Sequence, residues 1–532
     1  MVAGKLASRL GNEMEKLLVL ELASENEKIM TLPNKAEGPE AIPLVSTGVR
    51  GLDEVLNGGL TANRIYLVEG SPGSGKTTLA LQFLLYGAQR GQKALYITLS
   101  ETRAELKAIA ASHGWSLDHL EIHELVSEDG LDPEAEQSVL HPSEVELGET
   151  VNDVMSKVRS LEPDRVVFDS LSEMRLLSQN ALKYRRQVLA LKQFFVNKGC
   201  TVLLLDDKTS EPGDLQLHSI CHGVISLDQV LQEYGSERRR LRIAKMRGID
   251  FRRGTHDFDL NRGGITVYPR LIAAEHHRKF SNNAASTGVA ELDALLGGGL
   301  VPGTNTLLIG PSGVGKTTTT TRCVLSALER GQKAVYFLFD ETLATMLARS
   351  TALGMRLEPH IESGLLTVQQ IDPAEMSPGQ FSNRIRVAVE QHGVSVIVID
   401  SLNAYLQSMP GQRYLLLQMH ELLSYLNQQG VTTLIALGQH GLIGNVESDI
   451  DLSYLSDSII LFRFFEAAGK VLSAISVLKS RTSAHERTVR EFQVGVNGIQ
   501  VGAPLTDFDG VLTGLPKYSG DVPLLDPQVR TE

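Results

Sequence analysis

The pattern Gly-x-x-x-x-Gly-Lys-Thr occurs twice in this chain of 532 residues, and the two copies lie 240 residues apart. The first spans residues 70–77 and the second spans residues 310–317. Such a loop cradles phosphate with inward-turned backbone N–H groups at a helix N-terminus, where the helix dipole favours anions. Its glycines let the backbone turn sharply and approach the phosphates closely. The two loops therefore predict two nucleoside triphosphate sites.

Each loop lies between a predicted strand and a predicted helix. Residues 65–68 and 306–309 are apolar runs before the loops, and helical spacing of apolar residues follows them. In this context the lysine reaches the β- and γ-phosphates of ATP, and the following threonine holds Mg²⁺. The predicted ATP-binding residues are Gly70, Ser71, Gly73, Ser74, Gly75, Lys76, Thr77 and Thr78 in the first loop, and Gly310, Ser312, Gly313, Val314, Gly315, Lys316, Thr317 and Thr318 in the second.

The similarity between the two halves extends well beyond the loops. Ser-Thr-Gly-Val recurs at 46–49 and 286–289, and Arg-Gly-Gln-Lys-Ala recurs at 90–94 and 330–334. A constant offset identifies a tandem duplication. We expect an α/β fold of two P-loop domains, each with a mainly parallel central sheet flanked by helices. The expected boundaries are an N-terminal extension with an amphipathic helix at 1–44, a first domain at 45–270, a linker at 271–285, a second domain at 286–518 and a flexible tail at 519–532.

Two apolar runs end in an aspartate, Asp169 in the first repeat and Asp400 in the second. Continuous apolar runs suit a central parallel strand that is buried on both faces. A carboxylate at its carboxyl end would join Thr77 or Thr317 as a Mg²⁺ ligand. A surface aspartate after a core strand is the alternative for each, but the repetition favours the metal role.

Acidic residues also follow the strand that comes after each P-loop helix. Glu101 follows Ser100 in the first repeat, and Glu341 follows Asp340 in the second. Glu101, Asp340 and Glu341 are candidate general bases, whereas a serine cannot act as a carboxylate base. The alternative is that these acids serve the N-terminus of the next helix, since the same pattern suits helix capping.

A Lys-x-Arg pattern recurs late in each repeat, as Lys245 and Arg247 in the first and Lys479 and Arg481 in the second. A cation can stabilise the charge on a transferring phosphoryl group. Alternating basic and apolar residues could instead form the solvated face of a strand, but the recurrence favours a role at the site.

Composition is that of a soluble globular protein. The net charge of -12 argues against a general nucleic-acid coat, which would show a basic footprint. The three cysteines have no metal-like or disulfide-like spacing, which fits a reducing cytosol. No run approaches 18 apolar residues, so we expect a cytoplasmic protein without a membrane span.

Taken together, the paired P-loops, the Asp-Ser after each Mg²⁺ strand, and the stretches 237–240, 245–248, 456–461 and 510–514 resemble the KaiC-like branch of RecA-fold ATPases over residues 45–518. The resemblance implies two RecA-like domains in a two-tiered homo-hexamer with ATP and Mg²⁺ at the subunit interfaces. It implies an ATPase in the first domain and a serine/threonine autokinase in the second, acting in timing or stress signalling. Lys245, Arg247, Lys479 and Arg481 would then reach a neighbouring subunit's site, and a KaiB-like regulatory protein would be a partner.

The chain departs from the family pattern at two places near the chemistry. The family has two adjacent glutamates where this chain has Ser100-Glu101 and Asp340-Glu341. The family has an adjacent Ser-Thr as phosphoacceptors where this chain has Ser453-Tyr454. Ser453 is the candidate phosphoacceptor, and the tyrosine puts an ordered two-site cycle in doubt because its hydroxyl lies farther from the backbone.

Two other function classes are compatible with the same fold. One is a DNA-dependent motor like RecA or RadA, which the acidic charge disfavours. The other is a non-catalytic ring that binds ATP to hold its shape, which the intact lysines and carboxylates disfavour.

Overall fold

The structure is a computed structural model that describes residues 43–125, 142–178, 181–208, 216–231, 235–407, 412–439, 454–467, 469–495, 498–513 and 516–520. The helix expected within residues 5–30, the candidate phosphoacceptor Ser453 and residues 521–532 of the predicted tail lie outside these described ranges.

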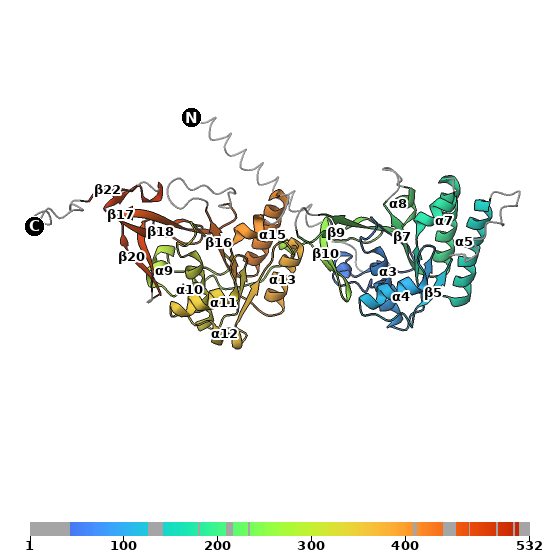
Figure 1. Ribbon diagram of the computed structural model, residues 1–532, viewed down its shortest axis with the longest axis horizontal. Coiled ribbons are helices and arrows are strands. Elements are labelled where there is room, and N and C mark those ends of the chain that lie inside the picture. The colour runs from blue at the N-terminus through green and yellow to red at the C-terminus, as the bar shows by residue number, and fades with distance from the viewer. Residues whose placement is uncertain are drawn as a thin grey trace, which may run out of the picture.

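Two lobes lie end to end, and each is built on a nine-stranded sheet with helices on its faces (Figure 1). The first sheet has the order β11-β10-β9-β8-β3-β7-β6-β4-β5, and the second repeats it as β20-β19-β18-β17-β12-β16-β15-β13-β14. Six neighbouring strands of each sheet are parallel, and the last three are joined in antiparallel fashion. The predicted α/β fold of two tandem RecA-like domains with mainly parallel sheets is confirmed.

The nine-stranded sheet of the first lobe consists of β3 (Ile65–Gly70), β4 (Ala94–Thr98), β5 (Glu121–Glu124), β6 (Arg165–Asp169), β7 (Thr201–Asp207), β8 (Gly223–Val230), β9 (Arg238–Met246), β10 (Thr255–Asn261) and β11 (Gly264–Tyr268). The helices beside this sheet are α3 (Lys76–Ala88), α4 (Arg103–Ser112), α5 (Pro142–Leu161), α6 (Leu171–Ser178), α7 (Ala181–Asn197) and α8 (Gln216–Ile220). A short pair, β1 (Leu44–Val45) and β2 (Leu60–Thr61), flanks α2 (Leu52–Val55).

The strands of the second lobe are β12 (Asn305–Gly310), β13 (Ala334–Leu338), β14 (Leu366–Gln370), β15 (Val396–Asp400), β16 (Thr432–Gly438), β17 (Ser458–Ala467), β18 (Lys470–Ser480), β19 (Arg490–Gly495) and β20 (Gly498–Pro504), and its helices are α9 (Ala290–Leu296), α10 (Lys316–Glu329), α11 (Leu343–Ala352), α12 (Glu358–Glu362), α13 (Pro378–Glu390), α14 (Leu402–Gln407) and α15 (Gln412–Gln428).

The apolar runs that the sequence singled out are central strands buried on both faces. In β6, Val167 packs into the core on one side of the sheet, and Val166 and Phe168 pack into the core on the other side. All three are at most 1% exposed. The strand is therefore fixed from both faces, and the carboxylate at its carboxyl end has a fixed place.

The repeated Ser-Thr-Gly motif is a structural clamp. The Asp53 carboxylate accepts hydrogen bonds from the hydroxyls of Ser46 (2.5 Å) and Thr47 (2.7 Å). Asp293 accepts the same pair from Ser286 and Thr287 in the second lobe. This part of the repeat therefore holds the entry of each domain against its first helix, away from the phosphate loop.

The lobes meet where α13 lies against the β9–β11 part of the first sheet (Figure 1). The Gly379 N–H, in the first turn of α13, donates to the Asp257 carboxylate at 2.8 Å, while the α13 cap Ser377 accepts from the Gln380 N–H. Any side chain at Gly379 would place its Cβ 2.8 Å from that of Asp257. One domain therefore supplies part of the N-terminal cap of a helix in the other.

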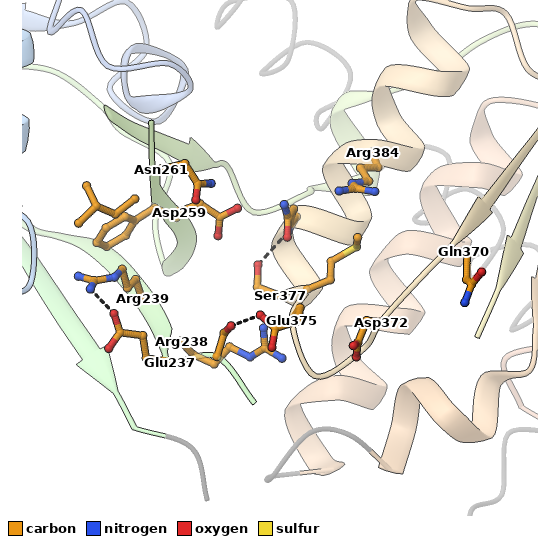
Figure 2. A pocket seen from close by; sticks show the side chains of 15 residues that line it. Glu237, Arg238, Arg239, Asp259, Asn261, Gln370, Asp372, Glu375, Ser377 and Arg384 are labelled. Carbon is orange, nitrogen blue, oxygen red and sulfur yellow. Dashed lines mark hydrogen bonds and ion pairs between the residues drawn. The ribbon is translucent and has the colours of Figure 1, made fainter. Parts of the chain in front are cut away.

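Two further contacts extend this interface. Arg386 on α13 forms a bidentate pair with Glu54, with N–O distances of 2.8 and 3.0 Å. The Arg238 guanidinium donates to the carbonyls of Pro373 and Ala374 at 3.0 and 3.1 Å. A polar cavity of about 490 Å³ lies between the lobes beside these contacts, with Arg239 and Asp259 on one wall and Glu375 and Arg384 on the other (Figure 2).

Replacing Asp257 by alanine should loosen the interface. The change removes the cap bond to Gly379 and leaves the neighbouring arginine Arg240 without its carboxylate, which lies 3.7 Å away. We expect the local opening free energy of α13 to fall by about 1–3 kcal/mol. Hydrogen exchange of the α13 amides measures this, with the exposed Asp250→Ala as control. Equal exchange rates in the two variants would contradict the capping role.

Candidate active site

Both phosphate loops have the geometry that the motif predicts. Gly73 and Gly75 have φ of +80° and +100°, and Gly313 and Gly315 have +79° and +108°, so each loop uses the left-handed region twice. The helices α3 and α10 begin at the loop lysines, Lys76 and Lys316. The unpaired N–H groups of each first turn therefore face the loop concavity.

The loop lysines are held differently in the two lobes. Both ammonium groups donate to carbonyls of their own loop, at 3.0 Å for Lys76 and 2.8 Å for Lys316. Lys76 also pairs with the Asp207 carboxylate at 2.7 Å. At the matching place on β16 the second lobe has Gly438, and burial lowers the pKa of Lys316 to about 8.

The strand-end aspartates lie beside the loop threonines. The Asp169 carboxylate accepts a hydrogen bond from the Tyr96 hydroxyl at 2.5 Å, and Asp400 accepts one from Tyr336 at 2.8 Å. Burial raises the pKa of both aspartates, and hydrogen bonds from the tyrosines and from Thr77 or Thr317 oppose the increase. A cation at these carboxylates would offset the cost of burying their charge.

These residues fit Mg²⁺-bound ATP. The second site is a cavity of about 480 Å³ that contains Lys316, Thr317 and Asp400. Across the described residues, histidine, cysteine and acidic side chains form no group of three that could hold a metal. Mg²⁺ commonly takes one or two protein ligands and completes its shell with phosphate and water, so one threonine and one aspartate per site suit it. The bound ion would neutralise charge on the phosphates.

In the first lobe Glu101 is not the cap residue of the next helix. The cap of α4 is Thr102, which forms a capping box with Glu105. Within the described chain, the buried Oε2 atom of Glu101 has no hydrogen-bond partner. Burial, helped by the charges of Asp169 and Glu105, raises the pKa of Glu101 to about 7, and Lys76 opposes the increase. A carboxylate with this pKa and a free oxygen can accept a proton from water near neutral pH.

In the second lobe both candidate acids are already engaged. The Glu341 carboxylate is held by one nitrogen of Arg349, which lies 2.6 and 2.7 Å from its two oxygens. The Asp340 carboxylate accepts a hydrogen bond from the Ser401 hydroxyl, next to Asp400. Both acids line the nucleotide cavity, so the structure brings them to the loop as predicted but binds them to partners.

The Lys-x-Arg pairs lie at the far end of each sheet from their own loop. Lys245 is opposite Val224 on β8, whereas the loop glycine Gly70 is opposite Leu227, so roughly 10 Å of strand separates them. The Lys245 ammonium donates to the Cys221 carbonyl at 2.9 Å, and Arg247 donates to the Ser219 carbonyl at 2.9 Å. Neither side chain points to the phosphate loop of its own chain.

The second lobe repeats this placement. Lys479 pairs with Ile459, which lies beside Leu307 and thus three residues before the loop glycine Gly310. Lys479 donates to the Ser456 carbonyl at 2.7 Å, and Arg481 lies 3.6 Å from the Asp457 carboxylate. Tyr454 is 53% exposed at the same end of the sheet, and its neighbour Ser453 lies outside the described residues.

The residues that sequence reasoning missed are partners of the predicted ones. Tyr96 and Tyr336 recur at the 240-residue offset, so the repeat itself could have shown them. Asp207 and Arg349 have no counterpart, because the matching residues are Gly438 and Ile109. Asp207 pairs with Lys76 from a neighbouring strand, and Arg349 pairs with Glu341 from the following helix, α11. The sequence motifs do not show such contacts.

The two arginines at the start of β9, Arg238 and Arg239, were also given no individual role by the sequence motifs. Arg239 lies at the loop end of β9 and donates to the Gly73 carbonyl at 2.7 Å, while its neighbour Arg238 contacts the second lobe.

The described part of the chain has no helix with both the length and the apolar character needed to cross a bilayer.

Known proteins match this chain over both lobes. The family described as KaiC ATPase matches residues 45–272 and 285–506. The circadian clock protein KaiC3 of Synechocystis sp. is 26% identical over 90% of this chain and 96% of its own length. The circadian clock oscillator protein KaiC of Synechococcus elongatus is 28% identical over 92% of this chain and 94% of its own length. Since the family model covers both repeats, each with its phosphate loop, the chain belongs to the KaiC ATPase family.

Proposed function

We propose that this chain forms a homo-oligomer, with six subunits as the expected number, and that each ATP is bound between neighbouring subunits. The observation that carries the proposal is the position of the Lys-x-Arg pairs. Lys245, Arg247, Lys479 and Arg481 lie at the sheet end opposite their own loops and point away from them. A neighbouring subunit would bring them to the phosphates, where they would stabilise the transferring group.

The two sites would then divide the chemistry. In the first, Glu101 would take a proton from the water that attacks the γ-phosphorus, and Thr77 and Asp169 would hold Mg²⁺. In the second, the acid next to Glu341 is Asp340, which already accepts a hydroxyl hydrogen bond from Ser401. An acid that holds a serine hydroxyl suits transfer to a serine of the protein, and Ser453 is the candidate acceptor. The second domain would therefore be a serine/threonine autokinase.

The role would be in timing or stress signalling, and the relatives named circadian clock oscillator proteins support the timing role. A regulatory protein similar to KaiB would be the corresponding partner. The acidic net charge of -12 disfavours DNA as the ligand.

Removing the loop lysines tests the ATPase. Because the lysine contacts the β- and γ-phosphates, Lys76→Ala or Lys316→Ala should remove hydrolysis at its own site, and the double variant should release no phosphate above background. Phosphate release with Mg²⁺-ATP measures this, with the exposed Lys107→Ala as control. A wild-type chain that releases no more than the double variant would favour the non-catalytic ring.

The first site should lose activity in mild acid. The pKa of Glu101 is about 7, so the fraction of active carboxylate falls as the pH drops below 7. Once the pH is well below the pKa, hydrolysis should fall by about tenfold per pH unit. The Glu341→Gln variant isolates the first site for this profile, and Glu101→Gln provides the matched background. A flat profile from pH 8 to pH 6 would exclude Glu101 as the base.

The autokinase is tested by labelling. Incubation with γ-labelled ATP should label Ser453, and Ser453→Ala and Lys316→Ala should each abolish the label, while Lys76→Ala leaves the second site's chemistry in place. Mass spectrometry of the labelled peptide locates the phosphate. Hydrolysis without any label on residues 451–456 would show that the second domain is an ATPase only.

A further inference from the structure

The catalytic acid of the second site has a partner that the first site lacks. Both oxygens of Glu341 lie within 2.7 Å of one Arg349 nitrogen. The pair is largely enclosed, since the side chains are 19% and 31% exposed. At the matching position of the first repeat, α4 has Ile109, which packs against the apolar core. The partner of the acid therefore differs between the two sites because one helix position holds an arginine in α11 and an isoleucine in α4.

Arg349 is not built into another network. Its Nε and Nη2 atoms are buried and have no hydrogen-bond partner within the described chain. The same side chain lines the nucleotide cavity together with Lys316 and Asp400. Its placement is therefore set by the Glu341 carboxylate, and the fold itself does not need a guanidinium there, as Ile109 shows.

We propose that Arg349 is a positioning residue that holds Glu341 away from water, and so makes the second site hydrolyse ATP more slowly than the first. This inference rests on the proposed ATP turnover of the second site. Slow loss to water keeps the γ-phosphoryl group available for a protein hydroxyl, so Arg349 sets which acceptor the second site favours.

The chemistry of ATP hydrolysis explains why the Arg349 contact, called the restraint on Glu341 below, would slow the reaction. The water oxygen bonds to the γ-phosphorus, the bond from that phosphorus to the β–γ bridging oxygen breaks, and ADP leaves with the electron pair. The proton that water loses must pass to a carboxylate oxygen. At Glu341 both oxygens are hydrogen-bonded to Arg349, so one of these charge-assisted bonds must weaken before an oxygen can accept that proton. Glu101 meets no such requirement, because its Oε2 atom is free.

The test uses the full chain with Glu101→Gln, so that phosphate release reports the second site alone. In that background Arg349→Ile should raise kcat by about three- to tenfold, the equivalent of one hydrogen bond, with KM unchanged. Arg349→Lys, which keeps the charge, should restore most of the restraint. Adding Glu341→Gln to Arg349→Ile should remove the gain, and the exposed Arg356→Ile should leave kcat as it is.

The opposite substitution in the first site provides a second test that does not depend on the folding of the Arg349→Ile variant. With Glu341→Gln isolating the first site, Ile109→Arg should lower phosphate release there by a similar factor, while bound nucleotide per chain stays constant. A fall in kcat with Arg349→Ile would show that the arginine assists the reaction, and an unchanged kcat in both exchanges would show that it only packs. Either result overturns the restraint.

The two proposals fail in distinguishable ways. A wild-type chain without phosphate release above the Lys76→Ala/Lys316→Ala variant refutes the ATPase. A wild-type chain that hydrolyses ATP, with no gain from Arg349→Ile, refutes only the restraint on Glu341.

Discussion

Both sites depend on a carboxylate buried at the end of a central strand. Asp169 and Asp400 are 6% and 9% exposed, and burial disfavours their charged form. In each lobe a tyrosine hydroxyl and a threonine hydroxyl offset part of that cost, and a cation bound at the carboxylate would offset more of it. The core on both faces of the sheet fixes the strand, and the strand fixes the position of the carboxylate beside the phosphate loop.

On this common frame the two repeats differ in how the remaining charges are paired. In the first lobe the loop lysine Lys76 pairs with Asp207, and among the described residues the Oε2 atom of Glu101 has no hydrogen-bond partner. In the second lobe the arrangement is different: the Lys316 ammonium donates to carbonyls of its own loop, and the Glu341 carboxylate is paired with Arg349. The phosphate loops and the strand-end aspartates are the same in the two repeats, while the partners of Glu101 and Glu341 differ. This divergence supports different fates for the γ-phosphoryl group in the two domains.

The fold and the conformation of the two phosphate loops could be predicted because they depend on local sequence. The glycine spacing of residues 310–317 is enough to indicate the loop conformation. The continuous apolar run that ends at Asp400 is enough to indicate a buried central strand. The charge partners could not be predicted, because they come from distant strands or from one turn of a neighbouring helix. Asp207 reaches Lys76 from β7, and Asp257 reaches Gly379 from the other domain, 122 residues earlier in the chain. Only the packed structure determines such pairs.

The shared cap of α13 has a consequence for the order in which the protein is made. The first domain leaves the ribosome first and can fold as a unit before the second is complete. Asp257 is then already in position when α13 emerges, so the finished domain presents the acceptor that the helix N-terminus lacks. A second domain produced alone would leave the Gly379 N–H to bond with water instead of the Asp257 carboxylate.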